Sequence, residues 1–526
     1  MRVDVARLVA ALLIIPAINV YSQDPVAEKY AQTITADDLS YDLHVLASDS
    51  LEGRETGKKG QKMAARFLAS EFKKYGLQPP VKTDSGMSYF QKFELVKKEW
   101  EEVYLVVDKK KKVFLQDFYV YGDISLPKEE KLKVVFAGYG IDSPTYSDYT
   151  GLDVKGKAVI IFMGEPVKDG NSLVTGSKTL SYWANDWRRK AGAAKQKGAK
   201  CVFVIIGQEQ KDFDARLTQL KHHLQQPTMG FTYKERPGSA FFVPVQLAAE
   251  LLKTTEKELL NDKDTLGQTV KPVNLKLKSA HLKAKVKVKS TPVYTENVLG
   301  YIEGTDKKGE VLVITAHYDH LGKEGDKIFY GADDDGSGTS ALMELAQAFG
   351  KAKQEGHPPR RSILIMPVTG EEKGLLGSEY YTDHPVFPLD STVVDLNIDM
   401  IGRLDEAHEK NPNYVYLIGS NKLSTELHKI SEEANTTYTH IDLDYKFNAP
   451  DDPNRFYYRS DHYNFAKNKI PVIFYFNGTH ADYHQATDTV DKILFTKMEK
   501  ITRLVFYTAW ELANRDKRII VDVNGD

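Results

Sequence analysis

The run EVLVITAHYDH, residues 310–320, is followed by YGADDDGSGTSALMEL, residues 330–345, and this order of patterns decides the fold. The first run is apolar and rich in β-branched residues, which predicts a buried strand. In the second, apolar residues recur at helical spacing after residues that favour turns and helix N-caps. From residue 291 onward strand and helix patterns alternate, which predicts an α/β domain with a largely parallel sheet.

Three adjacent carboxylates, Asp333, Asp334 and Asp335, stand between the predicted strand and the predicted helix. Ionised neighbours of this kind repel one another, so the arrangement needs an explanation. A capped helix start is one interpretation. An EF-hand is a second, because spaced oxygen ligands fit its loop, but an EF-hand needs an entering helix where this chain has a strand. A transition-metal site is the third, and it depends on the rest of the chain.

The composition indicates a large soluble protein. With 526 residues the chain is long enough for two to four domains, and 41% hydrophobic and 27% charged residues fit globular cores. There are 71 basic and 73 acidic residues, a formal net charge of −2. This balance gives no support to nucleic-acid binding or to a polybasic membrane patch.

The first 22 residues resemble a secretory signal. Arg2 and Arg7 precede an apolar run that is too short to span a bilayer, and Ser22 fits a cleavage site before Gln23. A retained anchor is the alternative; after cleavage we expect no stable membrane span. The single cysteine, Cys201, excludes an intramolecular disulfide. We therefore expect export to the periplasm or exterior of a bacterium.

The texture of the sequence changes twice after the signal. Residues 36–77 have a helical pattern, residues 88–125 have short alternating segments, and residues 130–290 contain short buried-strand runs. The predicted organisation is a signal peptide (1–22), the first part of the main domain (23–129), an insertion (130–290) and the larger part of the main domain (291–526).

Metal-capable side chains follow four apolar runs in the last third of the chain. In open α/β sheets, ligands bind at the carboxyl ends of the strands, so these side chains are expected to meet. The set comprises His317 and Asp319, then Glu371 and Glu372, then Asp399, and finally His484, together with the triple-aspartate turn. Imidazole and carboxylate without thiolate favour zinc, with cobalt or manganese as alternatives. Two histidines and three carboxylates suit two ions that share a bridging carboxylate, about 3.5–4 Å apart.

The motifs HYDH, GADDDGSG, GEEKGLLGS, NIDMIG, SDHYNF and DYHQATDT resemble those of the co-catalytic dizinc peptidases typified by bacterial leucyl aminopeptidases. Glutamate carboxypeptidase and glutaminyl cyclase are relatives. The resemblance covers about residues 36–125 and 291–515. It implies a three-layer α/β/α peptidase domain with a mixed, largely parallel sheet. The insertion resembles a β-rich protease-associated domain.

This resemblance implies two zinc ions and a role for each ligand. His317 and Asp399 would hold one zinc, Glu372 and His484 would hold the other, and Asp334 would bridge them.

Further roles follow from the same resemblance. Asp319 would hydrogen-bond the second nitrogen of His317, and Glu371 would be the general base. Tyr483 is a candidate donor to the oxyanion, and Asp461 is a candidate for the substrate pocket. A strained peptide bond is expected after the bridging aspartate.

The expected function is a secreted zinc-dependent exopeptidase that hydrolyses N-terminal residues from peptides through a metal-activated water. A carboxypeptidase or dipeptidase of the same family is the alternative, because Arg455 and Arg459 could hold a substrate carboxylate. A glutaminyl cyclase is disfavoured because the full two-metal set is present. The sequence has no G-x-S-x-G elbow at a strand end and no H-E-x-x-H helix, which excludes two other hydrolase classes.

Overall fold

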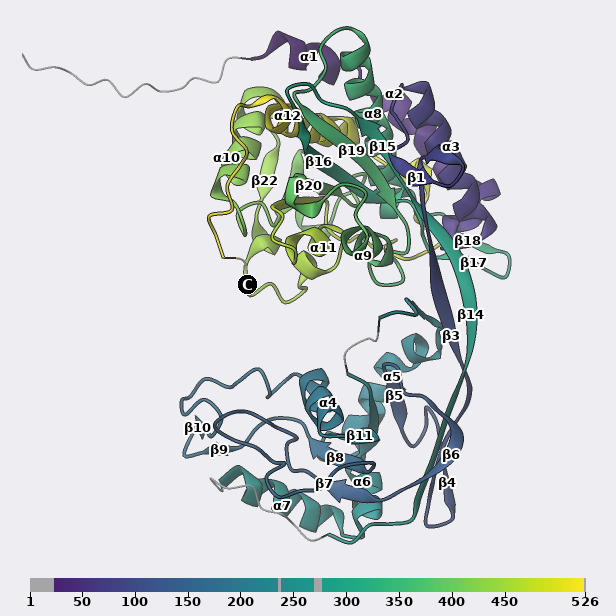
Figure 1. Ribbon diagram of the computed structural model, residues 1–526, viewed down its shortest axis with the longest axis vertical. Coiled ribbons are helices and arrows are strands. Elements are labelled where there is room, and N and C mark those ends of the chain that lie inside the picture. The colour runs from purple at the N-terminus through teal and green to yellow at the C-terminus, as the bar shows by residue number, and fades with distance from the viewer. Residues whose placement is uncertain (1–22, 235–237, 269–276, 525–526) are drawn as a thin grey trace, which may run out of the picture. The chain divides into compact units, whose positions relative to one another are not determined.

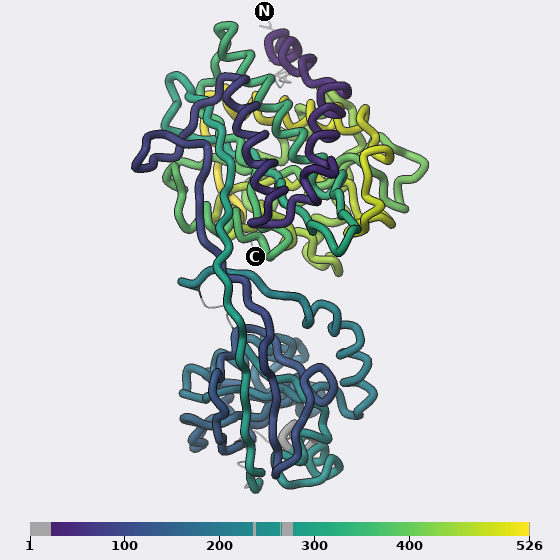
Figure 2. Tube along the Cα trace, turned by 90° about the vertical axis from the view of Figure 1, so that its right-hand side faces the viewer, coloured from purple at the N-terminus to yellow at the C-terminus, as the bar shows by residue number. Residues whose placement is uncertain are grey.

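A computed structural model describes residues 23–234, 238–268 and 277–524, which form two compact units (Figure 1). The first unit contains the chain up to residue 93 and from residue 294 onward, and the second contains residues 94–293. The sequence had placed the insertion at 130–290. Its first boundary lies earlier because strand β3 (Phe90–Val107) begins in the first unit and continues into the second. Strand β14 (Leu282–Val298), its neighbour in one sheet, returns the chain (Figure 2).

The first unit is built on a mixed seven-stranded sheet. Its four inner strands, β19, β16, β20 and β23, are mutually parallel, and β15 and β21 join them antiparallel at either side. This confirms the predicted mixed, largely parallel sheet. In sheet order the strands are β15 (Gly300–Ile302), β19 (Arg361–Val368), β16 (Lys307–His317), β20 (Thr392–Ile398), β23 (Val472–Phe476), β21 (Tyr414–Ile418) and β22 (Asp442–Asp444).

Helices cover both faces of this sheet, as the strand sequences require. Leu312 and Ile314 of β16 point into one core, which includes α2 (Ala36–Leu46), α8 (Gly338–Gln354) and α12 (Phe495–Asn514). Val311 and Val313 point into the opposite core, with α9 (Leu376–Asp383) and α11 (His462–Ala466). Successive strand residues alternate between faces, so an inner strand buried on both sides reads as a continuous apolar run. The remaining named elements are α1 (Pro25–Ala31), α3 (Lys59–Lys74), α10 (Thr425–Ala434), β1 (Val81–Thr83), β2 (Gly86–Ser88), β17 (Gly322–Glu324) and β18 (Lys327–Phe329).

The second unit has its own sheets and cores. One five-stranded sheet contains four parallel strands and the antiparallel edge strand β5, and a second sheet has the order β12-β3-β14-β6 with β4 beside β3. Cys201 is buried on β11. The strands are β4 (Lys110–Val113), β5 (Tyr119–Tyr121), β6 (Leu126–Leu132), β7 (Val134–Phe136), β8 (Ala158–Phe162), β9 (Val167–Lys168), β10 (Asn171–Ser172), β11 (Cys201–Ile206), β12 (Thr228–Gly230) and β13 (Ala240–Pro244), and the helices are α4 (Trp187–Gln196), α5 (Gln210–Gln225), α6 (Val245–Leu252) and α7 (Glu256–Gln268).

The proposed signal, residues 1–22, lies outside the described residues. Within the described part of the chain, no helix is both long enough and apolar enough to cross a membrane.

Candidate metal centre

The five predicted metal ligands meet at the carboxyl ends of the four parallel strands. His317 is the last residue of β16, and Asp399 follows β20 directly. Glu372 lies in the loop after β19, and His484 lies in the loop after β23. Asp334 belongs to η2 (Ala332–Ser337), the turn that leads into α8. This is the sheet edge where the sequence predicted ligand binding.

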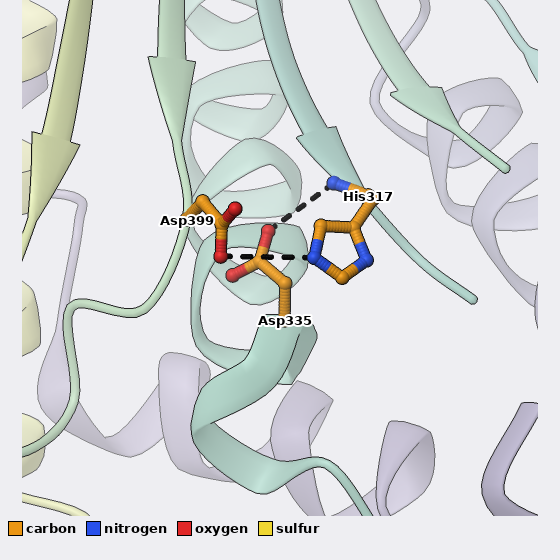
Figure 3. Close-up of side chains that lie close together, drawn as sticks. All are labelled: His317, Asp335 and Asp399. Atoms are coloured by element: carbon orange, nitrogen blue, oxygen red, sulfur yellow. Dashed lines mark hydrogen bonds and ion pairs between the residues drawn. The ribbon is translucent and has the colours of Figure 1, made fainter. Parts of the chain in front are cut away.

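The first group of donors surrounds the Nε2 atom of His317. This atom lies 3.2 Å from Oδ1 of Asp334 and 3.6 Å from Oδ1 of Asp399. Figure 3 shows Asp399 and Asp335 on the same side of the His317 ring. All these side chains are buried or nearly so. The peptide bond after Asp334, which was expected to be strained, is cis.

The second group of donors surrounds the Nε2 atom of His484. This atom lies 3.0 Å from Oδ2 of Asp334 and 3.3 Å from Oε2 of Glu372. The two carboxylate oxygens of Asp334 therefore face two different histidines. A bridging ligand needs this arrangement, because each oxygen can serve a different ion.

Asp335 also lies close to His317 and Asp399, but its oxygens are already occupied. They accept backbone N–H groups from His317 at 3.2 Å, Gly338 at 2.8 Å and Met400 at 3.1 Å. Asp335 therefore holds the ends of β16, α8 and β20 together. We assign the ligand role to Asp334, whose carboxylate has the histidine nitrogens as neighbours.

His320 is a site residue that the sequence reasoning missed. Its Nδ1 atom lies 2.8 Å from Oε1 of Glu372, although the angles are not those of a hydrogen bond. His320 also groups with Asp334 and Glu372 within ligand distance. It is the last residue of the motif HYDH, so the signal was present in the sequence. It is an alternative to His484 as a donor to the second ion.

Orphaned polar atoms show that these residues fit a cation. Both ring nitrogens of His320 and Oε1 of Glu372 are buried without a hydrogen-bond partner. Buried polar atoms usually have hydrogen-bond partners. A bound metal ion would be the missing partner of these three atoms. The donor set of imidazoles and carboxylates suits zinc.

The charges in the centre are strongly coupled. Burial favours the neutral form of His484, but hydrogen bonds to Asp334 and Glu372 outweigh burial and raise the pKa of His484 to about 10. Burial and the charge of Asp334 oppose ionisation of Glu372, yet contacts with His320 and His484 lower its pKa to about 2. Metal ions would take the place of the protons that now offset the carboxylates.

Asp319 supports His317 in a different way from the one predicted. The Nδ1 atom of His317 lies 3.0 Å from the backbone carbonyl oxygen of Asp319, whereas the Asp319 carboxylate is 3.9 Å away. That carboxylate accepts a hydrogen bond from the Thr56 hydroxyl at 2.6 Å and one from the backbone N–H of Glu371 at 3.3 Å. The prediction named the right residue but the wrong acceptor atom, because the carboxylate is engaged by the loop of Glu371.

Glu371 and Tyr483 line the same centre. Oε2 of Glu371 lies 3.9 Å from Nε2 of His317, and burial raises the pKa of Glu371 well above its usual value. The ring of Tyr483 stacks on His484, with centroids 3.9 Å apart. Both positions are compatible with the roles implied by the family resemblance.

The predicted substrate contact of Asp461 does not fit the structure. Its side chain is fully buried and accepts a hydrogen bond from the Ser378 hydroxyl at 2.5 Å. Asp461 lies next to Ser460, whose hydroxyl donates to Oδ2 of Asp399 at 2.7 Å. Ser460 of the SDH motif therefore holds the ligand Asp399 by a hydrogen bond. The Asp461 side chain is buried, which prevents direct contact with a substrate.

Arg455 and Arg459 are exposed, as a substrate-binding role would require. The guanidinium of Arg455 lies over the ring of Tyr458, and that of Arg459 lies over the ring of Phe456. The charge of Arg459 also reaches Tyr483, since it lowers the pKa of that hydroxyl against a larger effect of burial.

The fold and the site define a class: an α/β protein with a candidate two-metal centre at the carboxyl edge of its sheet. Residues 297–509 match the model of Peptidase family M28. The resemblance to dizinc peptidases is thereby confirmed at the level of the family.

Relatives and one solved structure agree with this assignment. A "Probable zinc metalloprotease" of Pyrenophora tritici-repentis is 39% identical over 118 residues, 21% of this chain and 23% of that protein. A "Probable glutamate carboxypeptidase" of Arthroderma benhamiae is 39% identical over 111 residues, 21% and 14% of the two chains. "Aminopeptidase YwaD" of Bacillus subtilis is 33% identical over 127 residues, 24% and 25% of the two chains.

These sequence matches span a quarter or less of each relative's length. The structure of an aminopeptidase from Aneurinibacillus sp. strain AM-1 covers 95% of this chain and 99% of its own, with a TM-score of 0.56 and 18% identity. That likeness shows a shared fold.

Proposed function

We propose that the protein is a zinc-dependent exopeptidase that removes N-terminal residues from peptides. The observation that carries the proposal is the carboxylate of Asp334, whose two oxygens lie 3.2 and 3.0 Å from the Nε2 atoms of two different histidines. A carboxylate shared in this way suits a pair of ions. The match of residues 297–509 to the model of Peptidase family M28 supports the peptidase chemistry.

The residues of the centre divide the work of peptide hydrolysis. His317 and Asp399 would hold one zinc, Glu372 and His484 the other, and Asp334 both. When bound, the ions would act as Lewis acids on a water molecule and on the scissile carbonyl.

Glu371 would accept a proton from water and return it to the leaving amine. Burial raises its pKa, which suits a group that must both take and release a proton. Tyr483, stacked on His484, is placed to donate a hydrogen bond to the oxyanion.

The direction of cleavage is the point where two candidates compete. Similarity to an aminopeptidase supports cleavage from the N-terminus. Similarity to a glutamate carboxypeptidase, and the exposed Arg459, whose charge lowers the pKa of Tyr483 against a larger effect of burial, favour a carboxypeptidase or dipeptidase instead. Among the described residues, Arg459 forms no ion pair with a carboxylate, and its exposed guanidinium, which lies over the Phe456 ring, could hold a substrate carboxylate.

A comparison of blocked peptides tests the direction. A free tripeptide, its N-acetyl form and its C-terminal amide are incubated with the zinc-loaded protein, and the products are identified by mass. An aminopeptidase cleaves the amide and rejects the acetylated peptide, because the free amine aligns the first peptide bond. Cleavage of the acetylated peptide with rejection of the amide would establish the carboxypeptidase alternative.

Export and the nature of the insertion remain parts of this proposal. A charged start, a short apolar core and Ser22 support cleavage before Gln23. The intact mass of protein recovered from its host checks this, and a chain that retains Met1 contradicts it. We propose that the second unit is a protease-associated domain, and that substrates are peptides released outside the cytoplasm.

A further inference from the structure

Two charged side chains from distant parts of the chain form hydrogen bonds with the backbone around the turn that carries Asp334. We propose that Arg54 and Asp488 are positioning residues that fix this turn and thereby set the bridging carboxylate for both ions. The inference rests on the proposed two-metal centre and deepens it. Neither residue is a ligand. Arg54 also donates to the Leu46 carbonyl at 2.7 Å, and Asp488 also lies 3.9 Å from the Arg403 guanidinium.

Asp488 accepts hydrogen bonds from backbone N–H groups of the turn. Its Oδ2 atom accepts the backbone N–H of Asp333 at 3.0 Å and that of Asp334 at 3.2 Å, and its Oδ1 atom lies 3.2 Å from the same Asp333 nitrogen. Its own carbonyl accepts the N–H of Ala332 at 3.2 Å. The Asp488 side chain is fully buried. Asp488 also follows His484 by four residues, so it ties the loop of one ligand to the turn of another.

Arg54 donates hydrogen bonds to backbone carbonyl groups next to the turn. Its guanidinium donates to the carbonyl oxygens of Tyr330 at 2.8 Å and Gly331 at 2.8 Å, immediately before the turn. It also donates to the carbonyl of Tyr318 at 2.9 Å, which follows the ligand His317. The side chain is fully buried. A single guanidinium thus binds the backbone beside two metal ligands.

The backbone at and before Arg54 adopts left-handed conformations. Glu52, Gly53 and Arg54 all have positive φ angles, of 48°, 66° and 52°. A Cβ atom on Gly53 would lie 2.3 Å from the carbonyl oxygens of Gly322 and Phe329. Non-glycine residues in this left-handed region are strained, and such strain persists where the surroundings over-determine it. A simple helix connection would not need this geometry.

The charge of Arg54 has no carboxylate partner at hydrogen-bond distance in the described structure; its donors go to carbonyls. Burying a guanidinium in this way is costly. Its nearest acidic influences are Asp335, Asp319, Asp334 and Asp488. Arg54 therefore also supplies positive charge that partly offsets these buried carboxylates.

The main test replaces Asp488 with Asn. The amide has nearly the same shape, but its NH2 group replaces one carboxylate oxygen. It therefore loses the second contact to the Asp333 N–H and the negative charge that strengthens the bonds to Asp333 and Asp334. Because Asp334 serves both ions, the affinity for both zinc ions should fall, about 10–100-fold for loss of an outer-shell partner. Zinc affinities are measured against a competing chelator. The spin coupling of the two ions in dicobalt protein reports the bridge itself and should weaken.

Asp482→Asn is the matched control. Asp482 lies in the same loop, but its partners are the side chains of Thr487, Arg403 and Lys492, not the turn. It should leave both zinc affinities and the spin coupling unchanged.

Arg54→Lys tests the other side, since lysine keeps the charge but cannot reach the same set of carbonyls. Hydrogen exchange of residues 330–337 in metal-free protein provides a readout that needs no bound ion. Exchange there should speed up in both positioning variants and not in Asp482→Asn.

Wild-type zinc affinities and wild-type spin coupling in Asp488→Asn would overturn the inference. If Asp488→Asn does not fold, unchanged exchange of residues 330–337 in folded Arg54→Lys overturns it. If the wild-type protein binds two zinc ions but cleaves no peptide, the proposed function fails, and the positioning roles are still decided by these metal and exchange measurements.

Discussion

At the scale of single residues, the three adjacent aspartates have three different sets of partners. Asp334 lies between two histidines, and Asp335 accepts three backbone N–H groups. Asp333 accepts the backbone N–H of Gly402 at 2.6 Å and contacts the side chains of Asn477 and His480. Three carboxylates can be neighbours in sequence because each points to a different set of positive partners. The helix-cap and EF-hand interpretations are not needed.

The paired glutamates give the first prediction. Glu371→Gln should leave zinc bound while kcat falls about 10²–10⁴-fold, the range typical of losing a general base. Glu372→Gln should weaken binding of one zinc ion, because Glu372 contacts His484 and His320. Zinc content and peptide hydrolysis are measured on both variants. Identical behaviour of the two in both assays would show that the roles are assigned wrongly.

Asp319 gives the second prediction. Because the ring of His317 is held by a backbone carbonyl, Asp319→Asn should keep zinc affinity within a few-fold. Its main effect should be on kcat, since the carboxylate accepts the N–H of Glu371. Metal titration and steady-state kinetics separate the two effects. A loss of zinc affinity as large as that of a ligand variant would support the originally predicted carboxylate contact.

At the scale of elements, the sequence predicted what the backbone pattern determines. Apolar runs such as residues 311–316 became inner parallel strands, and the ligands followed their carboxyl ends. Burial of Asp461 and the acceptor used by His317 depend on tertiary packing, which spacing along the chain does not contain. The early start of the insertion was missed because β3 is one continuous strand, so no turn or composition change marks residue 94. The contribution of Arg54 was hidden in a segment that reads as a helix connection.

The junction of α2, α3 and α8 gives the third prediction. Burial raises the pKa of Asp42 in α2 to about 8, and burial raises that of Glu344 in α8 to about 8. Above about pH 4 the unfolded Asp42 is ionised, whereas the folded side chain keeps its proton up to about pH 8, so stability falls as pH rises through this window. Asp42→Asn removes this penalty.

Thermal unfolding checks the pH dependence. Asp42→Asn should raise Tm at pH 8, by an amount equivalent to about 1 kcal/mol or more, and should change it little at pH 4. Asp37→Asn is the control, because Asp37 lies in the same helix but is exposed. An equal gain at both pH values would mean that the effect is not one of ionisation.

At the scale of the whole molecule, the centre belongs to one unit although its chain is interrupted by the other. Cores of the first unit contain residues before residue 93 and after residue 294, and the cores that contain residues 105–286 are separate. Metal binding should therefore stabilise one of two unfolding transitions.

Removal of metal gives the fourth prediction. Fully loaded protein should contain about two zinc ions per chain, as a bridged site implies. A chelator should abolish hydrolysis and lower the Tm of one calorimetric transition, since ligands that bind only the folded state stabilise it. Elemental analysis and calorimetry before and after chelation provide the measurements. Full activity at one ion per chain, or a calcium requirement instead of zinc, would contradict the two-metal site.

The wide separation of the site residues in the chain has a consequence for how the protein comes into being. The two residues that hold the bridging turn, Arg54 and Asp488, lie far apart in the sequence. The second unit, residues 94–293, is encoded between them. During synthesis, a ribosome must therefore translate the whole second unit and continue past Asp488 before the backbone around Asp334 can be held from both sides. A polypeptide that stops between these two residues would lack half of these contacts, so under the proposed function it would be inert.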